Sequence, residues 1–153
     1  MHYPSYSFDQ TADATQFFFE SIGSKGIIQK TVIFTQTSNV SIYNLALCDV
    51  DLATNFLDDL SVSNNGDMAK IIATVVQILY IYLTRYPDRS IIFAGNTPAR
   101  NRLYRIAINQ TYSELDKMFS LLGFRNGGWE DFTPDQPYEL YLITTELSAI
   151  FRS

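Results

Sequence analysis

Cysteine and histidine are nearly absent from this sequence, which has one of each among its 153 residues. Cys48 by itself can form neither an intramolecular disulfide nor a cysteine-rich zinc site, and a lone cysteine is typical of a reducing compartment such as the cytoplasm. His2 lies at the N-terminus, where chains are least ordered, so it is poorly placed for a Ser-His-Asp or Cys-His arrangement or a metal centre. We therefore expect neither those hydrolase classes nor a bound metal.

Several other signals are missing. No Gly-rich run ends in Gly-Lys-Ser/Thr, and no Gly-x-Gly-x-x-Gly run follows a predicted strand, so the standard nucleotide-binding signatures are absent. We expect no secretory signal, because residues 1–8 contain neither a basic nor an apolar run. The longest apolar stretch, Ile71–Leu83, is interrupted by Thr74 and Gln77 and is shorter than the roughly 18 to 20 residues of a membrane span. It predicts a buried helix and no membrane contact.

Positive charge is also scarce: 11 Lys and Arg stand against 16 Asp and Glu, a net charge of −5. Five aspartates fall between positions 49 and 67 with no Lys or Arg among them. Nucleic-acid binding depends on neutralising phosphates with cations, so this balance argues against it. Hydrophobic residues are abundant, at 46% of the chain. This content predicts one globular domain over residues 1–153.

The first half of the chain is typical of a sheet. Strand-like runs at 16–22 and 27–35 flank Gly23-Ser24-Lys25-Gly26, whose glycines allow the positive φ of a tight hairpin. Further runs at 40–48 and 56–62 predict an antiparallel meander of four strands.

The second half alternates helices with strands. Helical spacing of apolar residues predicts a helix over 67–86 with Asp67 as N-cap, and 90–94 is a short strand, so 56–94 should form a right-handed crossover. Thr97-Pro98 begins a helix over 97–109, and the Thr111/Glu114 capping box begins another over 112–122, which Gly123 ends. A loop at 127–129 and a last strand at 138–145 follow. The predicted fold class is α/β (α+β): a mixed, mainly antiparallel sheet with covering helices.

The first candidate site is Asp58, in the strand before the long helix. Alternation places it on the same face as Phe56, Leu60 and Val62, where burial would raise its pKa and make it a candidate general base. The alternative is that Asp58 caps a backbone amide or pairs with an arginine.

The second candidate is the turn Ser63–Gly66 before the helix that starts at Asp67. Unpaired amides at a helix N-terminus bind anions, so Asn64, Asn65 and Gly66 could hold a phosphate. The alternative is that the Asp67 carboxylate satisfies those amides as a cap.

The third and preferred candidate is the beginning of the helix over 97–109. Arg102 and Arg105 share a helix face, and Arg100 lies one turn from Tyr104. Together with Asn96 and Thr97 these residues could bind a phosphate or carboxylate. The alternative is a solvated face, or arginines that pair with the Asp-rich turn.

Three segments, FESIGSKG (19–26), DDLSVSNNGD (58–67) and GNTxARxRLY (95–104), resemble a family of small proteins of unknown function found mainly in Bacteroidetes. The resemblance spans nearly the whole chain and implies no established activity.

The order of elements is also similar to the GCN5-related N-acetyltransferase fold: three strands, a long helix after a Gly-containing turn, a strand, a helix with Leu-Tyr, and a last strand. That resemblance implies acyl-CoA pyrophosphate binding by Asn64, Asn65 and Gly66, with Asp58 as base and Tyr104 as acid. Of the three signature positions in that turn, Ser63, Gly66 and Met68, only Gly66 matches.

Two functional hypotheses follow. The preferred one is a non-catalytic ligand-binding or interaction module on an acetyltransferase-like scaffold, which takes a small anionic ligand or a protein partner and needs no cofactor. The alternative is an acyl-CoA-dependent N-acyltransferase that uses acetyl-CoA.

Overall fold

The computed structural model describes residues 4–51, 56–58, 65–93 and 98–145. In chain order the elements are β1 (Asp9–Gln10), β2 (Gln16–Gly23), β3 (Gly26–Gln36), β4 (Ile42–Asp51), β5 (Phe56–Asp58), α1 (Met68–Arg85), β6 (Ser90–Phe93), α2 (Pro98–Met118), β7 (Ser120–Arg125), β8 (Gly128–Asp131) and β9 (Leu140–Thr144).

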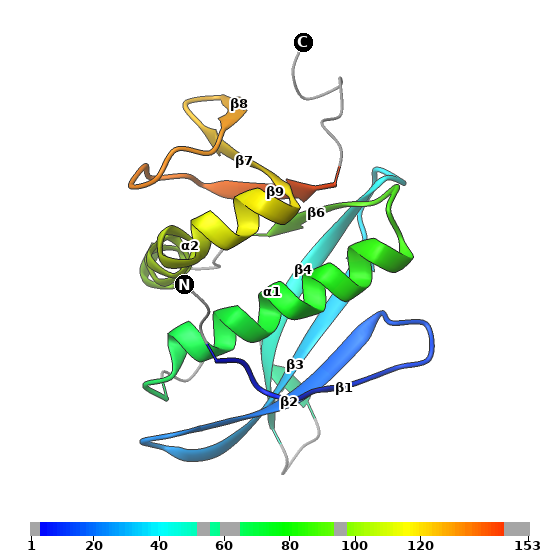
Figure 1. The fold of residues 1–153 in the computed structure, drawn as a ribbon, viewed down its shortest axis with the longest axis vertical. Coiled ribbons are helices and arrows are strands. Elements are labelled where there is room, and N and C mark those ends of the chain that lie inside the picture. Colours follow the sequence, from blue (N-terminus) through cyan, green and yellow to red (C-terminus); the bar gives the residue numbers. More distant parts are fainter. Residues whose placement is uncertain (1–3, 52–55, 59–64, 94–97, 146–153) are drawn as a thin grey trace.

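The strands form one sheet, and the two helices of the described residues pack on the same face of it (Figure 1). The sheet has nine strands in the order β1-β2-β3-β4-β6-β9-β7-β8, with β5 paired to β4 beside that path. The pairing of β4 with β6 is parallel and the other pairings are antiparallel. The predicted α+β class and the mixed, mainly antiparallel sheet are therefore confirmed.

The predicted hairpin at 23–26 is confirmed. Strands β2 and β3 pair from Gln16↔Ile33 to Gly23↔Gly26, and Gly26 has a φ of +90°. Along β2, Phe17, Phe19 and Ser21 are buried while the residues between them are more exposed. This period-2 pattern gives the hairpin one face toward the helices.

The right-handed crossover predicted over 56–94 does not start from β5 as expected. Strand β6 pairs in parallel with Ile42–Asn44 of β4, and β5 pairs antiparallel with Asp49–Asp51 at the other end of β4. The parallel connection therefore runs from β4 to β6, because β5 spans three residues and occupies only one end of that edge. The rest of the predicted strand, at 59–62, lies outside the described residues.

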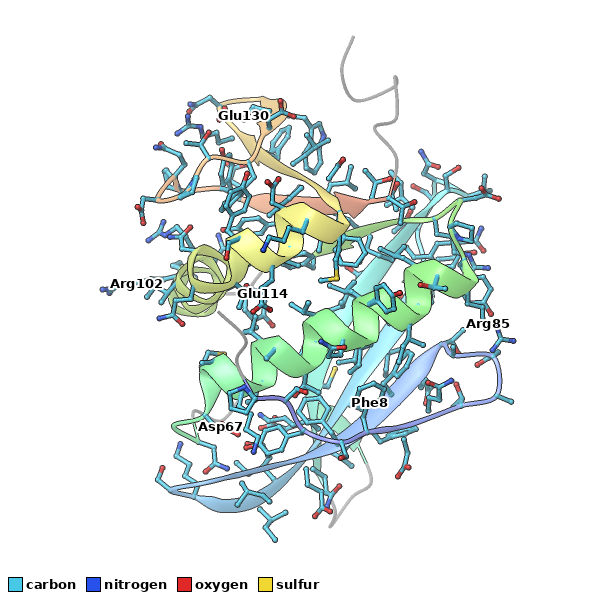
Figure 2. The ribbon with its side chains drawn as sticks, in the orientation of Figure 1. Phe8, Asp67, Arg85, Arg102, Glu114 and Glu130 are labelled. Atoms are coloured by element: carbon cyan, nitrogen blue, oxygen red, sulfur yellow. The ribbon has the colours of Figure 1, made fainter. Side chains whose placement is uncertain are left out.

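Helix α1 confirms the helix predicted over 67–86. By length and composition α1 qualifies as a membrane span, with a mean hydropathy of 1.3, yet 56% of that stretch is buried in the fold. Asp67 and Arg85 lie at its two ends (Figure 2). Asp67 is the N-cap residue of α1, as predicted, but its side chain makes no capping hydrogen bond, so the predicted cap by its carboxylate is wrong.

The two helices predicted over 97–109 and 112–122 are one helix, α2. Thr111 begins no new helix: it is buried inside α2, and its hydroxyl donates to the Ile108 carbonyl at 3.4 Å. Leu115 continues the buried face of Ile108, so packing favours an unbroken helix. Residues 120–122 belong to strand β7 and not to a helix.

A second hairpin occupies the position of the predicted loop at 127–129. Strands β7 and β8 pair from Leu122↔Asp131 to Arg125↔Gly128, around Asn126 and Gly127, whose φ angles are +53° and +78°. Positive φ at both central residues is typical of a type I′ turn, which Asn-Gly favours. The predicted last strand is confirmed as β9.

Candidate functional site

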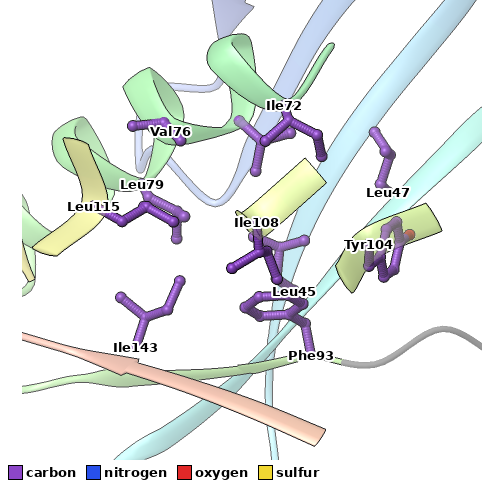
Figure 3. A pocket seen from close by; sticks show the side chains of 11 residues that line it. Leu45, Leu47, Ile72, Val76, Leu79, Phe93, Tyr104, Ile108, Leu115 and Ile143 are labelled. Carbon is purple, nitrogen blue, oxygen red and sulfur yellow. The ribbon is translucent and has the colours of Figure 1, made fainter. Parts of the chain in front are cut away.

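A cavity of about 40 Å³ lies between the two helices and the inner face of the sheet (Figure 3). Its walls are apolar and come from α1, α2, β4, β6 and β9. Tyr104 is buried at this cavity, and its ring meets the ring of Phe93 edge-on with centroids 6.4 Å apart. The structure therefore brings Tyr104, the predicted acid, to an apolar cavity and not to the turn before α1.

Tyr141 lies on the same inner face of the sheet as Phe93 and directly opposite it, in the paired strand β9. Its side chain is 0% exposed, and its ring stacks on that of Phe93 with centroids 5.2 Å apart. Among the described residues its hydroxyl has no hydrogen-bond partner. Burial raises the pKa of Tyr141 to about 12, and the positive charge of Arg105 on α2 opposes part of that rise. A buried hydroxyl thus stands unpaired within the electrostatic reach of a guanidinium.

Two arginines of α2, Arg102 and Arg105, could bind an anion. Within the part of the chain that the structure describes, neither Arg102 nor Arg105 pairs with a carboxylate. Arg102 is exposed and points away from the sheet in Figure 2, whereas Arg105 is half-buried. Arg100 belongs to α2, but its side chain is not described, and Asn96 and Thr97 lie outside the described residues.

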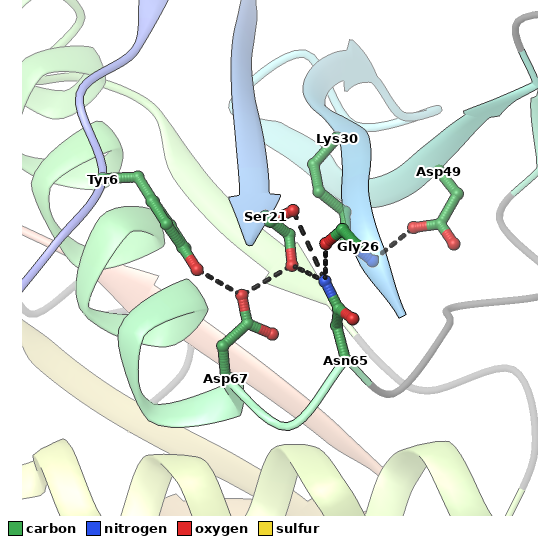
Figure 4. A network of polar contacts seen from close by, with 7 residues as sticks. All are labelled: Tyr6, Ser21, Gly26, Lys30, Asp49, Asn65 and Asp67. Atoms are coloured by element: carbon green, nitrogen blue, oxygen red, sulfur yellow. Dashed lines mark hydrogen bonds and ion pairs between the residues drawn. The ribbon is translucent and has the colours of Figure 1, made fainter. Parts of the chain in front are cut away.

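Asp49 and Asp67, the two aspartates of the Asp-rich segment whose side chains are described, have partners other than these arginines. Asp49 forms an ion pair with Lys30 (Figure 4), and both are buried on the inner face, directly opposite each other in β3 and β4. Asp58 stands opposite Asp49 in the next strand pair, so its backbone neighbours this ion pair, but its side chain is not described.

Asn65 joins the start of α1 to the β2–β3 hairpin (Figure 4). Its side-chain oxygen accepts from the Lys25 amide at 2.6 Å, and its side-chain nitrogen donates to the Gly26 carbonyl at 2.9 Å and to Ser21 Oγ at 3.1 Å. The Asn65 backbone carbonyl accepts from the Ser24 amide at 3.1 Å. Gly66 beside it has a φ of +79°, and Asn64 lies outside the described residues. The Asn65 side chain therefore serves a structural linkage.

The Asp67 carboxylate completes this network. Its Oδ2 accepts from the hydroxyls of Tyr6 and Ser21, each at 2.5 Å, while its Oδ1 is buried without a described hydrogen-bond partner. Burial and the bond to Asp67 raise the pKa of the Tyr6 hydroxyl. The network ties the N-terminal segment, the hairpin and α1 together.

Sequence reasoning missed two residues, Lys30 and Tyr141. Lys30 stands at an inward position of an alternating strand, which signals a buried, paired lysine. Tyr141 carried no signal, because whether its hydroxyl finds a partner depends on residues far from it in the sequence.

The comparisons with known proteins leave the acetyltransferase resemblance and the bacterial source as predictions. No curated protein matches the chain, and no solved structure matches it. One family model covers residues 2–146, nearly the whole length. The chain therefore belongs to the family described as "Family of unknown function (DUF6934)".

Proposed function

We propose that this chain is a non-catalytic module that binds a small anionic ligand between Arg105 and the Tyr141 hydroxyl, with Arg102 at the rim. We call this pair the Arg105–Tyr141 site. The observation that carries the proposal is the Tyr141 hydroxyl, which is fully buried and has no hydrogen-bond partner among the described residues. The positive charge of Arg105, which has no described carboxylate partner, lowers the pKa of this hydroxyl against the rise that burial causes.

The physical reason is the unsatisfied donor. A buried polar group without a partner destabilises the fold by about 1–3 kcal/mol, a penalty that an acceptor would remove. A carboxylate or phosphate oxygen can accept from the phenol and from the guanidinium together, and charge-assisted bonds of this kind are the stronger ones. The Tyr141 ring packs against Phe93, Phe132 and Tyr138, so the hydroxyl is held in place before a ligand arrives.

The alternative, an acyl-CoA-dependent N-acyltransferase, is favoured by one observation: Tyr104 adjoins an apolar cavity, where an acyl chain could lie. It would use acetyl-CoA, with Asp58 as base. The Asn65 side chain counts against it, because that amide is engaged with the hairpin. Pyrophosphate binding would then fall on the backbone of residues 64–66.

The partner of the module is also proposed. A protein partner, in place of a small anion, would contact the exposed Arg102. The cytoplasmic location, and the exclusion of nucleic acid and membrane as partners, stay predictions from composition.

The proposal is tested by isothermal titration calorimetry with inorganic phosphate, acetate and acetyl-CoA. Losing a hydrogen bond to a charged group removes about 1.5–3 kcal/mol, so Arg105→Gln and Tyr141→Phe should each weaken anion binding about 10- to 150-fold. Lys117→Gln, which removes the same charge from the exposed end of α2, is the matched control and should leave binding unchanged.

Tyr141→Phe keeps the ring and deletes only the unpaired oxygen, so the variant should be at least as stable as the wild type in thermal unfolding. Anion binding that is equal in wild type and Tyr141→Phe would refute the site. Acetyl-CoA binding that survives in Arg105→Gln would favour the acyltransferase.

A further inference from the structure

Strands β1 and β2 form one edge of the sheet (Figure 1), and a groove of about 420 Å³ lies there between residues 6–9 and β2. On the β2 side the groove is lined by Phe18, Glu20 and Ile22, which alternate with buried residues and therefore share the outer face, away from the helices. Asp9 also lines the groove and stands directly opposite Phe18, so it lies on the same face. This face is exposed, at 39% for Phe18 and 60% for Ile22.

The main chain of Glu20 is open to this groove. The β2–β3 turn fixes which residues of β2 bond to β3, and the alternate ones, Phe18, Glu20 and Ile22, direct their amides and carbonyls to the outer edge. Phe18 pairs with Asp9 in β1, and the Ile22 amide donates to the Tyr6 hydroxyl at 3.0 Å. Within the described part of the chain, no backbone hydrogen bond joins the N-terminal segment to Glu20. An unpaired donor and acceptor therefore stand between two occupied positions about 13 Å apart, at about 3.4 Å per residue.

The groove is also acidic. Asp9 and Glu20 are both exposed, and neither forms an ion pair with a described residue. Gln29 Nε2 donates to Glu20 Oε2 at 3.0 Å, which positions that carboxylate at the groove. Phe18 adds an aromatic ring that can contact a cation. Residues 1–75 contain three Lys and eight Asp or Glu, so the surrounding charge also favours a cationic ligand.

We propose that this groove binds an extended basic segment of a partner protein. One residue of that segment pairs its amide and carbonyl with the main chain of Glu20, and its Lys or Arg side chain reaches Asp9, Phe18 and Glu20 on the outer face. The open strand edge selects a peptide over a small organic cation, because a peptide supplies a donor and an acceptor at strand spacing. The two carboxylates select a basic side chain over an acidic one.

Three capped pentapeptides test this proposal in calorimetric titrations of the wild-type protein at low ionic strength. Acetyl-Thr-Val-Lys-Val-Thr-amide has a central lysine, and its analogue with a central glutamate is the matched peptide of opposite charge. The third peptide carries an N-methyl group on the lysine amide, which removes the donor for the Glu20 carbonyl. The lysine peptide should bind at least about tenfold more tightly than the glutamate peptide, and N-methylation should weaken its binding about two- to tenfold.

Variants of the two carboxylates test the charge. Glu20→Gln keeps an acceptor for Gln29, so it should leave the fold intact and weaken binding of the lysine peptide about two- to fivefold, the effect of one exposed ion pair. Asp9→Asn/Glu20→Gln should weaken binding about 4- to 25-fold. Glu139→Gln, which removes the same charge from an exposed position just before β9, is the matched control and should leave the affinity unchanged.

Other results would overturn the proposal. Equal affinity for the lysine and glutamate peptides, or no binding of either at millimolar concentration, would refute it. Equal binding of the N-methylated peptide, or butylammonium binding as tight as the lysine peptide, would assign the groove to a small cation instead. A concentration-dependent dimer in analytical ultracentrifugation that Glu20→Lys disrupts would make a second copy of the chain the occupant. The anion titrations of the Arg105–Tyr141 site do not involve this groove, so either proposal can fail alone.

Discussion

Gly123 in β7 should not tolerate a side chain, because the ring of Tyr138 lies directly over it. A Cβ added at Gly123 would stand 2.3 Å from Cδ1 and 2.4 Å from Cε1 of that ring. Non-bonded carbons pack at about 3.5–4.0 Å, so Gly123→Ala forces the ring to move by more than about 1 Å.

The size of the effect follows from what Tyr138 contacts. The ring is almost fully buried, and its hydroxyl donates to Glu130 Oε2 at 2.9 Å and accepts from the Thr133 amide at 2.9 Å. Overpacking a buried position destabilises by about 1–3 kcal/mol, and a displaced hydrogen bond adds about 1 kcal/mol. We expect Gly123→Ala to lower the free energy of unfolding by about 2–4 kcal/mol.

Urea denaturation measures this change, with Gly128→Ala as the matched control. Gly128 lies in the partner strand β8, and a Cβ there meets no atom within 4 Å. The control should therefore be neutral or slightly stabilising, since alanine restricts the unfolded chain. Equal denaturation midpoints for the two variants would refute the placement of Tyr138 over β7.

Three further predictions concern the polar contacts. Lys30→Met should destabilise by about 3–5 kcal/mol in urea denaturation by leaving Asp49 without its cation, and Lys30→Met/Asp49→Leu should recover most of the loss; a double variant as unstable as the single one would contradict this. Asn65→Ala should destabilise by about 2–3 kcal/mol in thermal unfolding, because the hairpin loses the amide that joins it to α1. Arg125 lowers the pKa of Glu130, so this carboxylate stabilises the fold above its unfolded-state pKa and loses that contribution as pH falls through its lower folded-state pKa. Stability measured between about pH 5 and 3 should therefore fall less in Glu130→Gln than in the wild type.

Local sequence signals predicted the elements that local physics decides. The glycines at 23 and 26 indicated the first hairpin, and of the two only Gly26 has the positive φ that glycine adopts freely. The long apolar repeat indicated α1, since its spacing matches one helix face whatever lies opposite. Asn126-Gly127 is an equally strong signal for a hairpin. The predicted loop at 127–129 did not take this signal into account.

Local sequence signals gave wrong predictions where an element depends on packing or pairing with another part of the chain. Thr111 and Glu114 match a capping box, yet the apolar face that α2 presents to the core continues through them, and burial of Leu115 outweighs a cap. Likewise, the pairing of β6 with β4 depended on the short β5, which occupies only one end of that edge of β4 and leaves the other end open.

The sequence by itself therefore determined the hairpin at 23–26, the extent of α1, the α+β class and the arginines at the start of α2. Only the tertiary structure decided that Lys30 pairs with Asp49, that Asn65 belongs to the hairpin, and that the Tyr141 hydroxyl is buried with no partner among the described residues. The physical reason is that a turn or helix face depends on residues adjacent in the chain, whereas a site depends on which side chains the folded layers bring together.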